Sequence, residues 1–279
     1  MLVRELMGAS VELAAAGFDV TDPVIDRPLP GGGGRVVAER ERAIVSVPEV
    51  GTFWIADGSR IGFEPEPDVE PGVVSMWLHG TVASLLMAQR GRFALHASVV
   101  AIQGRSVALT GARRAGKSTT ALRLRQRGHE LVTDDVSPLD CDGSVTVHPF
   151  SRPVHVLPQT AQSLGLDVSA AGRLFADHPK LALPPPGRTS IELGAVVVLR
   201  VENDATVAIR RVRGADAHWS IATNVYRVEL LGDLWREDLF EWAGAVAARV
   251  PVFAVTRPGE GWTVDEVADA VEAIARDQS

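Results

Sequence analysis

Cysteine is almost absent from this chain of 279 residues, which contains only Cys141. A single thiol cannot form an internal disulfide, so the sequence fits a reducing compartment and excludes a zinc site built from several cysteines. Long apolar runs are also missing, because hydrophobic stretches stay near strand length, short of the ~20 residues that span a bilayer. The N-terminus lacks the sustained apolar segment of a secretory signal. We therefore expect a cytoplasmic protein with no membrane partner.

Basic residues are in deficit as well. The chain has 28 Lys and Arg against 35 Asp and Glu, a formal net charge of −7. Proteins that bind nucleic acid normally carry a basic surplus, so we expect no nucleic-acid partner, and any attraction for phosphate must be local. The hydrophobic content of 46% is sufficient to bury a substantial core, in one large domain or two small ones.

Glycine and proline punctuate the first part of the chain. Short β-like stretches at 42–47 and 51–56 predict a small β-rich region over residues 1–72. Apolar residues then recur at helical spacing over 73–89, which predicts a helix at the start of a larger domain, residues 73–279.

That larger domain shows an α/β pattern. Two β-runs, 93–102 and 106–110, are separated by Gln103-Gly104 as in a tight hairpin. A helix is expected over 117–127, ended by Gly128 in the left-handed conformation, followed by a strand at 130–133. Further elements are expected as strands at 195–201, 205–212 and 252–255, a helix at 234–249, and a last helix to about 276 that begins with a Thr263–Glu266 capping box.

A phosphate-binding motif follows the second strand of the hairpin. Residues 111–118 fit the pattern G-x-x-x-x-G-K-S/T of a P-loop without a mismatch. The glycines allow backbone amides to point at an anion, the lysine reaches the β and γ phosphates, and the serine hydroxyl serves Mg²⁺. The expected nucleotide-binding residues are Gly111, Ala112, Arg113, Arg114, Ala115, Gly116, Lys117, Ser118 and Thr119.

Two aspartates end the strand after the P-loop helix. Asp134 and Asp135 therefore lie at the edge of the sheet where ligands gather in open α/β folds. One carboxylate can hold Mg²⁺ while the other accepts a proton from an attacking hydroxyl, and their mutual repulsion raises the proton affinity of one of them. A pair of turn aspartates without catalytic work is the alternative.

His96 lies in the first strand of the predicted hairpin, on the face that it shares with Ser98 and Val100. A lone histidine in an apolar strand is usually a core residue. The hairpin, however, brings His96 level with Gly111, within reach of the phosphates or the aspartates. The remaining six histidines show no spacing typical of metal ligands.

Read together, residues 95–140 resemble the catalytic domain of HPr kinase/phosphorylase and its shorter serine-kinase relatives, some of which modify peptides. The shared features are a histidine about fifteen residues before the P-loop, R-G-H at the end of the P-loop helix, here 127–129, and D-D at the end of the next strand. The resemblance implies a P-loop kinase core on a mixed sheet, as in phosphoenolpyruvate carboxykinase. It also implies that Asp134 is the catalytic base, that Asp135 and Ser118 hold Mg²⁺, and that His96 supports the aspartates.

This sequence departs from the family pattern in three places. Arg113-Arg114-Ala115 replaces the usual serine and glycine in the loop, and the segment around Glu192 is at most a remnant of the signature linked to phosphorylase activity. The short N-terminal region replaces a separate domain. Lys180 and Arg188 flank a proline-rich loop and, with Glu192, are candidate contacts to phosphate or substrate.

The sequence thus predicts an ATP- and Mg²⁺-dependent kinase that phosphorylates a serine of a protein or peptide, for which a lasso peptide precursor is one candidate. A small-molecule kinase and a non-catalytic nucleotide sensor remain alternatives. Retention of Lys117, Ser118 and both aspartates favours catalysis over sensing. A homo-oligomer is possible, and the sequence does not distinguish its order.

Overall fold

The structure is a computed structural model that describes residues 10–12, 18–29, 32–150, 152–176, 178–187, 189–203 and 206–277. These residues pack into two compact units. The first comprises Met1–Phe93 with Arg227–Leu239, and the second comprises Ala94–Tyr226 with Phe240–Ser279. The predicted division into residues 1–72 and 73–279 stays a prediction.

An antiparallel meander forms the sheet of the first unit. Its strands are β1 (Ser10–Glu12), β2 (Ile25–Pro28), β3 (Arg35–Ala38), β4 (Arg42–Val47), β5 (Gly51–Ala56) and β6 (Arg60–Pro65), in the order β1-β6-β5-β4-β3-β2, with β1 parallel to β6. Burial alternates along β4, as expected of a sheet with one covered face. The β-rich region predicted at 42–47 and 51–56 is therefore confirmed.

One continuous apolar helix follows the meander. It consists of α2 (Pro71–Trp77), a π-helical turn η1 (Leu78–Val82) and α3 (Ala83–Ala88). The helix predicted over 73–89 is thus confirmed. By length and composition alone these 18 residues could also cross a membrane, although the sequence predicts no membrane-spanning segment. Most of them are buried, as in the core helix of a globular protein. This unit also contains α7 (Val228–Leu231) and the start of α8 (Arg236–Arg249).

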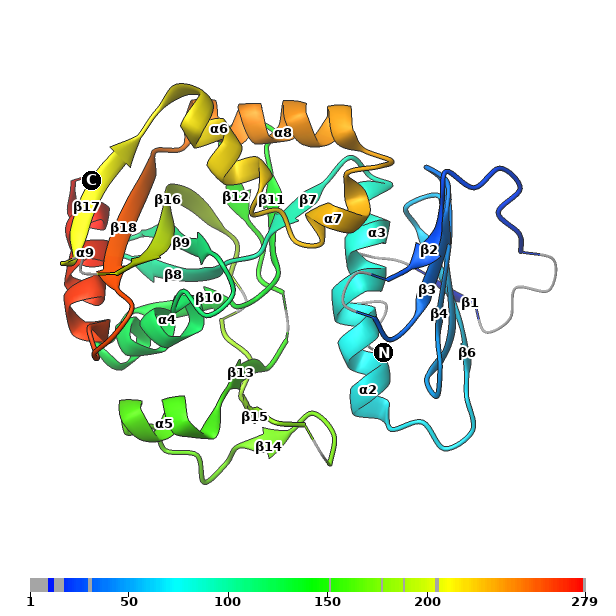
Figure 1. Ribbon diagram of the computed structural model, residues 1–279, viewed down its shortest axis with the longest axis horizontal. Coiled ribbons are helices and arrows are strands. Elements are labelled where there is room, and N and C mark those ends of the chain that lie inside the picture. Colours follow the sequence, from blue (N-terminus) through cyan, green and yellow to red (C-terminus); the bar gives the residue numbers. More distant parts are fainter. Residues whose placement is uncertain are drawn as a thin grey trace. The chain divides into compact units, whose positions relative to one another are not determined.

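A mixed sheet forms the centre of the second unit (Figure 1). Its central strands are β10 (Glu130–Thr133), β8 (Ser98–Ile102), β9 (Arg105–Gly111), β16 (Ile191–Glu202), β18 (Val252–Pro258) and β17 (Ala208–Val212), in that spatial order. β16 is parallel to both β9 and β18, whereas β8, β10 and β17 join by antiparallel pairings. The predicted mixed α/β class is confirmed, and the likeness to phosphoenolpyruvate carboxykinase stays a prediction.

Shorter strands extend this sheet at the start of β16. They are β12 (Thr146–Val147), β11 (Ser137–Asp140) and β7 (Phe93–Leu95). The single β-run predicted over 93–102 is thus two strands, β7 and β8, which belong to different parts of the sheet. A separate small sheet contains β13 (Val154–Val156), β15 (Leu181–Leu183) and β14 (Gly172–Arg173), with α5 (Pro158–Leu164) beside it.

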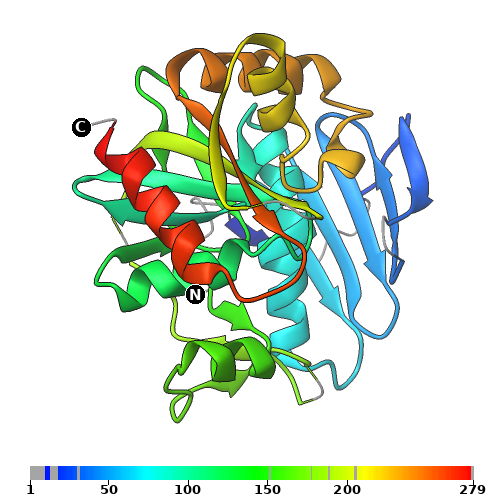
Figure 2. The ribbon, with the colours of Figure 1, turned by 60° about the vertical axis from the view of Figure 1, so that its left-hand side comes forward.

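Two helices cover one face of the central strands. Figures 1 and 2 show α4 (Lys117–Gln126) and α9 (Val264–Arg276) side by side. Their apolar residues share a buried cluster with β8, β9 and β16. Gly128 has φ +95° and donates to the Arg125 carbonyl, so the predicted left-handed helix end is confirmed. Thr263 makes no side-chain capping hydrogen bond, so the predicted capping box does not form.

No sequence pattern predicts α6 (Gly214–Ala222), which lies between β17 and α7. This helix matters for the site because Asn224 lies two residues after its end.

Candidate functional site

The hairpin of β8 and β9 determines which residues lie beside the start of the phosphate loop. Gln103 and Gly104 have φ of +52° and +85°, the paired positive values of a tight hairpin turn. The register pairs Ser98 with Leu109. Because β10 is antiparallel to β8 and β8 is antiparallel to β9, β10 and β9 end at the same edge of the sheet. The two aspartates therefore emerge beside the loop.

The backbone of the loop requires glycine at both of its ends. Gly111 has φ +132°, and a Cβ on it would lie 2.4 Å from the carbonyl oxygen of Leu199. Gly116 has φ +108° and immediately precedes α4. The path between them ends at the N-terminus of a ten-residue helix, whose unpaired amides and positive dipole end favour an anion.

Lys117 lies folded into the loop. Its Nζ donates to the carbonyl oxygens of Gly111 at 2.9 Å and Ala112 at 3.3 Å, and its side chain is buried. Burial lowers the pKa of Lys117, and the positive charge of Lys180 acts in the same direction, while both aspartates oppose it. The ammonium group is thus positioned at the loop before any phosphate binds.

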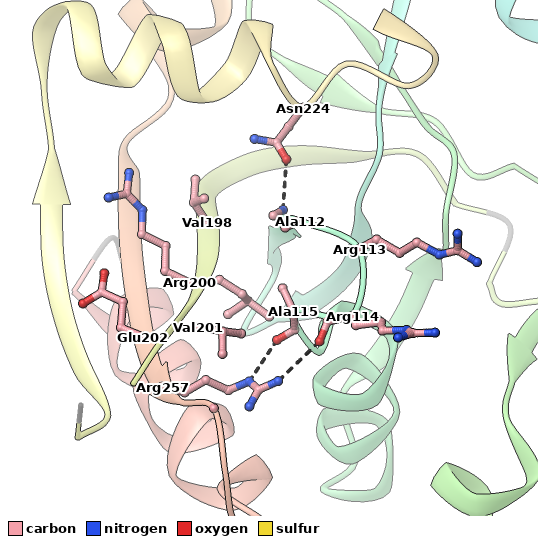
Figure 3. Close-up of a pocket in the computed structure, with 13 residues that line it drawn as sticks. Ala112, Arg113, Arg114, Ala115, Val198, Arg200, Val201, Glu202, Asn224 and Arg257 are labelled. Carbon is pink, nitrogen blue, oxygen red and sulfur yellow. Dashed lines mark hydrogen bonds between the residues drawn. The ribbon is translucent and has the colours of Figure 1, made fainter. Parts of the chain in front are cut away.

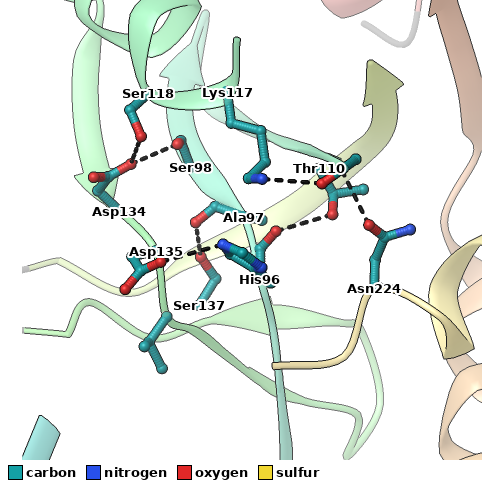
Figure 4. A network of polar contacts seen from close by, with 12 residues as sticks. His96, Ala97, Ser98, Thr110, Lys117, Ser118, Asp134, Asp135, Ser137 and Asn224 are labelled. Atoms are coloured by element: carbon teal, nitrogen blue, oxygen red, sulfur yellow. Dashed lines mark hydrogen bonds and ion pairs between the residues drawn. The ribbon is translucent and has the colours of Figure 1, made fainter. Parts of the chain in front are cut away.

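Asp134 is buried between two serine hydroxyls. Ser98 Oγ donates to Asp134 Oδ1 at 2.5 Å, and Ser118 Oγ donates to the same oxygen at 2.9 Å (Figure 4). The residue is only 6% exposed. Burial raises the pKa of Asp134, and the negative charge of Asp135 raises it further, whereas the serine hydrogen bonds act against this shift. Ser118, the second residue of α4, and the first aspartate are therefore in direct contact.

Asp135 faces a different set of partners. It has φ +70°, and its Oδ1 lies 3.2 Å from His96 Nε2 while its Oδ2 accepts from Arg152 Nη1 at 2.8 Å. Desolvation alone would raise the pKa of Asp135, but the His96 hydrogen bond and the Arg152 charge hold it well below its usual range. We call His96, Ser98, Ser118, Asp134 and Asp135 the aspartate cluster.

Hydrogen bonds to backbone carbonyls hold His96 and the segment that follows the two aspartates. Thr110 Oγ1 donates to the His96 carbonyl at 3.0 Å, and the His96 amide donates to the Asn224 carbonyl at 2.8 Å. Ser137 Oγ donates to the Ala97 carbonyl at 2.9 Å, which attaches the segment after the aspartates to the chain before β8. His96 thus lies level with the start of the loop, as the hairpin predicts.

Two distant residues hold the loop from elsewhere in the unit. Asn224 Oδ1 accepts from the Gly111 amide at 3.1 Å. Arg257 on β18 donates from Nε to the Ala115 carbonyl at 3.0 Å and from Nη2 to the Arg114 carbonyl at 3.3 Å (Figure 3). We call Asn224 and Arg257 the loop anchors. Together with the loop and the end of β16 they line an open pocket of about 590 Å³.

The other predicted contacts fall in different places. Arg113 and Arg114 are exposed on the loop, and Lys180 is exposed but close enough for its charge to act on Lys117 and Asp135. Arg188 lies outside the described residues.

Glu192 does not join the site. It lies at the start of β16, where the parallel register places its neighbour Leu193 opposite Ser106, and the same register places Leu199 opposite Gly111. The expectation of a phosphate contact from Glu192 therefore lacks support, because the residue lies at the far end of the strand from the loop.

Several polar residues of the site carry no motif in the sequence. Ser98, Arg152, Asn224 and Arg257 each sit in an ordinary strand or loop, and only the fold brings them to the P-loop. Ser98 alone had a signal, since it shares a strand face with His96 in the predicted hairpin. Arg152, the second partner of Asp135, and the side chains that hold the loop backbone could not have been found from spacing.

The donor atoms of the aspartate cluster fit a hard divalent cation in combination with a phosphate ligand. Over the described ranges, no three His, Cys, Asp or Glu side chains gather as a self-contained metal site. Mg²⁺ prefers oxygen ligands, usually takes one or two carboxylates, and completes its shell with phosphate oxygens and water. Ser118 and the two aspartates are the residues that could supply the protein ligands of such a set.

Comparisons with known proteins point to one family over a short segment. No family model matches the chain. It is 54% identical over 44 residues to HPr kinase/phosphorylase of Lactobacillus acidophilus, covering 16% of this chain and 14% of that protein. The corresponding protein of Clostridium beijerinckii is 46% identical over 52 residues, with 18% and 17% covered, and that of Treponema pallidum is 44% identical over 48 residues, with 17% and 15% covered.

The matched segment is small in every case, because the chain spans 14% to 17% of the length of these curated relatives. Among solved structures, the HPr(Ser) kinase/phosphatase from Coxiella burnetii aligns with 66% of this chain and 88% of its own, at 16% identity and a TM-score of 0.34, too low to carry an argument. Over the matched segment the chain is similar to HPr kinase/phosphorylase, which confirms the resemblance predicted from its motifs.

Proposed function

We propose that this protein transfers the γ-phosphoryl group of ATP to a hydroxyl group in a Mg²⁺-dependent reaction. One observation carries the proposal: Ser118, the first hydroxyl after the loop lysine, lies 2.9 Å from the buried carboxylate of Asp134. Phosphate capture and proton acceptance are thereby adjacent. The name of the relatives, HPr kinase/phosphorylase, describes the same class of reaction.

The loop residues bind and orient the triphosphate. The N-terminus of α4 and Lys117 supply positive charge for the β and γ phosphates, and Ser118 with Asp135 would hold Mg²⁺. Bound Mg²⁺ neutralises charge on the phosphates. Asp135 is suited to this role because His96 and Arg152 fix both of its oxygens in place, and Lys180 adds a cation near the transferred group.

Asp134 is the proposed base. Ser98 and Ser118 both donate to its Oδ1, which orients the carboxylate and leaves Oδ2 to accept a proton from the acceptor. The acceptor oxygen forms its bond to the γ phosphorus as its proton passes to Asp134, the bond from that phosphorus to the bridging oxygen breaks, and ADP leaves. Every group in this step is held by at least one contact before substrate arrives.

A serine of a protein or peptide is the acceptor that we propose. The support is the similarity to relatives named HPr kinase/phosphorylase, a name that gives the protein HPr as the phosphoryl acceptor of those relatives. A ribosomally made peptide, such as a lasso peptide precursor, fits the same chemistry.

Incubation with γ-labelled ATP, Mg²⁺ and a panel of acceptors tests this function. The panel contains HPr, serine peptides, candidate precursor peptides and small alcohols. We expect label on a serine of one of the polypeptides, with the rate of labelling lowered about 10²- to 10⁴-fold when Asp134 is replaced by Asn. Label on a small alcohol alone would indicate a metabolite kinase, and tight ATP binding without transfer to any acceptor would favour a sensor.

A further inference from the structure

A second cavity adjoins the loop, away from the aspartate cluster. It has a volume of about 250 Å³ and lies between the first turn of α4 and the segment that joins β18 to α9. It touches the loop at Arg114 and Gly116, and the helix at Thr119 and Thr120. None of the described residues that line it belongs to the aspartate cluster.

The direction of a bound triphosphate follows from the proposed function, on which this inference rests. Lys117 and Ser118 mark the β and γ end, because the lysine reaches those phosphates and the serine serves the metal. The α phosphate and the nucleoside must therefore extend away from Asp134. The cavity beside Gly116 and Thr119 is in that direction and opens directly from the loop.

The walls of this cavity suit a nucleobase. Trp262 offers a broad aromatic face that is 49% exposed, and Val264 and Val267 are buried beneath. Arg257 adds a positive charge that its bonds to the loop carbonyls already hold in place. An aromatic face beside fixed polar groups is what nucleoside sites use, and base–aromatic stacking contributes about 1–3 kcal/mol per base.

The larger pocket on the loop has a different character. Its walls include Arg113, Arg114, Arg200 and Arg257 together with Glu202, and they contain no aromatic side chain. Such a surface suits an anionic group better than a base. We propose that the smaller cavity is the nucleoside subsite and that the Trp262 indole stacks on the base.

Calorimetry with two ligands tests the proposal. Mg²⁺-ATP has a nucleoside, whereas Mg²⁺-tripolyphosphate has phosphates only. For Trp262→Ala we expect ATP affinity to fall about 5- to 150-fold while tripolyphosphate affinity is unchanged, and Trp262→Phe should restore most of the loss. Trp219→Ala is the matched control, because Trp219 is 71% exposed on α6 and lines neither pocket.

The outcomes separate this inference from the function beneath it. If Trp262→Ala binds ATP within twofold of the wild type, or loses affinity equally for both ligands, Trp262 does not stack on the base. If the wild type binds neither ligand, the proposed function fails and the subsite fails with it. If the wild type binds both ligands with equal affinity, the loop binds phosphate as proposed, but the proposal of a nucleoside subsite is wrong.

Discussion

The aspartate cluster and the loop anchors both contact the same phosphate loop, but they reach it by different routes. Every member of the aspartate cluster lies between His96 and Asp135, along one strand–loop–helix–strand segment. The loop anchors come from far along the chain: Asn224 is 113 residues from its partner Gly111, and Arg257 is 142 residues from Ala115. Local chain order therefore specifies one set of contacts. In the other set, the pairing of β16 with β18 brings Arg257 to the loop, and the hydrogen bond from the His96 amide to the Asn224 carbonyl brings Asn224 there.

The two sets also differ in chemistry. The aspartate cluster consists of carboxylates, hydroxyls and an imidazole around the buried Asp134, whereas the loop anchors use an amide and a guanidinium to hold backbone groups. If the proposed function is correct, changes in the cluster should alter turnover, and changes in the loop or its anchors should alter nucleotide affinity.

Asp134→Asn should give the largest effect. An amide of nearly the same shape cannot accept the acceptor's proton, so we expect phosphoryl transfer to fall by about 10²- to 10⁴-fold while ATP affinity stays within a few-fold of wild type. Single-turnover transfer and calorimetry measure the two quantities. Asp142→Asn, an exposed carboxylate after β11, is the control, and unchanged turnover in Asp134→Asn would show that the base is misassigned.

Lys117→Ala should come next. Its ammonium group lies among the loop carbonyls, and its removal deletes a charged donor to the phosphates, for which we expect about a 10- to 100-fold loss of affinity. The loss should be equal for ATP and tripolyphosphate in calorimetry, with Arg125→Ala on the exposed face of α4 as the control. An unaltered dissociation constant would remove the P-loop from the account.

Arg257→Ala should have a smaller effect on affinity and none on the chemical step. Losing its bonds to Ala115 and Arg114 frees the loop carbonyls, so we expect ATP affinity to fall about 3- to 10-fold with single-turnover transfer at saturating ATP unchanged. Arg210→Ala, on the neighbouring β17, is the matched control. A large drop in transfer at saturating ATP would instead show that Arg257 acts on the chemical step, as the aspartate cluster does. The proposed division between residues that affect turnover and residues that affect affinity would then be wrong.

The smallest expected effect is on the pH dependence of folding stability, through His155, which lies near Arg152. Burial lowers the pKa of His155 to about 4 from 6.5, aided by the charges of Arg152, His178 and Lys180 and opposed by Asp135. The unfolded chain therefore binds a proton between pH 6.5 and 4 that the folded chain does not, so this residue makes stability fall as pH falls through that window.

His155→Phe keeps an aromatic ring and removes the proton site. We expect urea unfolding of the variant to match the wild type at pH 7.5 and to lose less stability on acidification to pH 5. Parallel pH profiles for the two proteins would mean that His155 protonates as readily in the folded chain as in the unfolded one.

The comparison also shows which parts of the molecule could be predicted from the sequence. The hairpin turn at Gln103-Gly104, the glycines of the loop and the end of α4 at Gly128 depend on short-range backbone geometry, so their residue types predict them. The split between β7 and β8 could not be predicted, because it depends on which distant strand each half pairs with.

Long-range pairing explains the remaining differences. The sequence predicts Glu192 as a contact to phosphate or substrate, but the register of β16 against β9 places Glu192 at the far end of the strand from the loop. Arg152 is not predicted because no motif surrounds it, although its Nη1 donates to Asp135 Oδ2 at 2.8 Å. Registers between strands more than 80 residues apart leave no mark in local sequence spacing.

The most direct test of the central claim is diffraction from crystals grown with Mn²⁺ and a non-hydrolysable ATP analogue. Anomalous scattering locates the metal without reference to a model. We predict one Mn²⁺ peak in contact with Ser118 Oγ and an aspartate carboxylate, with the analogue's γ phosphate against Lys117 and Asp134. A metal and triphosphate bound away from the loop, or aspartates turned from the phosphates in that complex, would contradict the account.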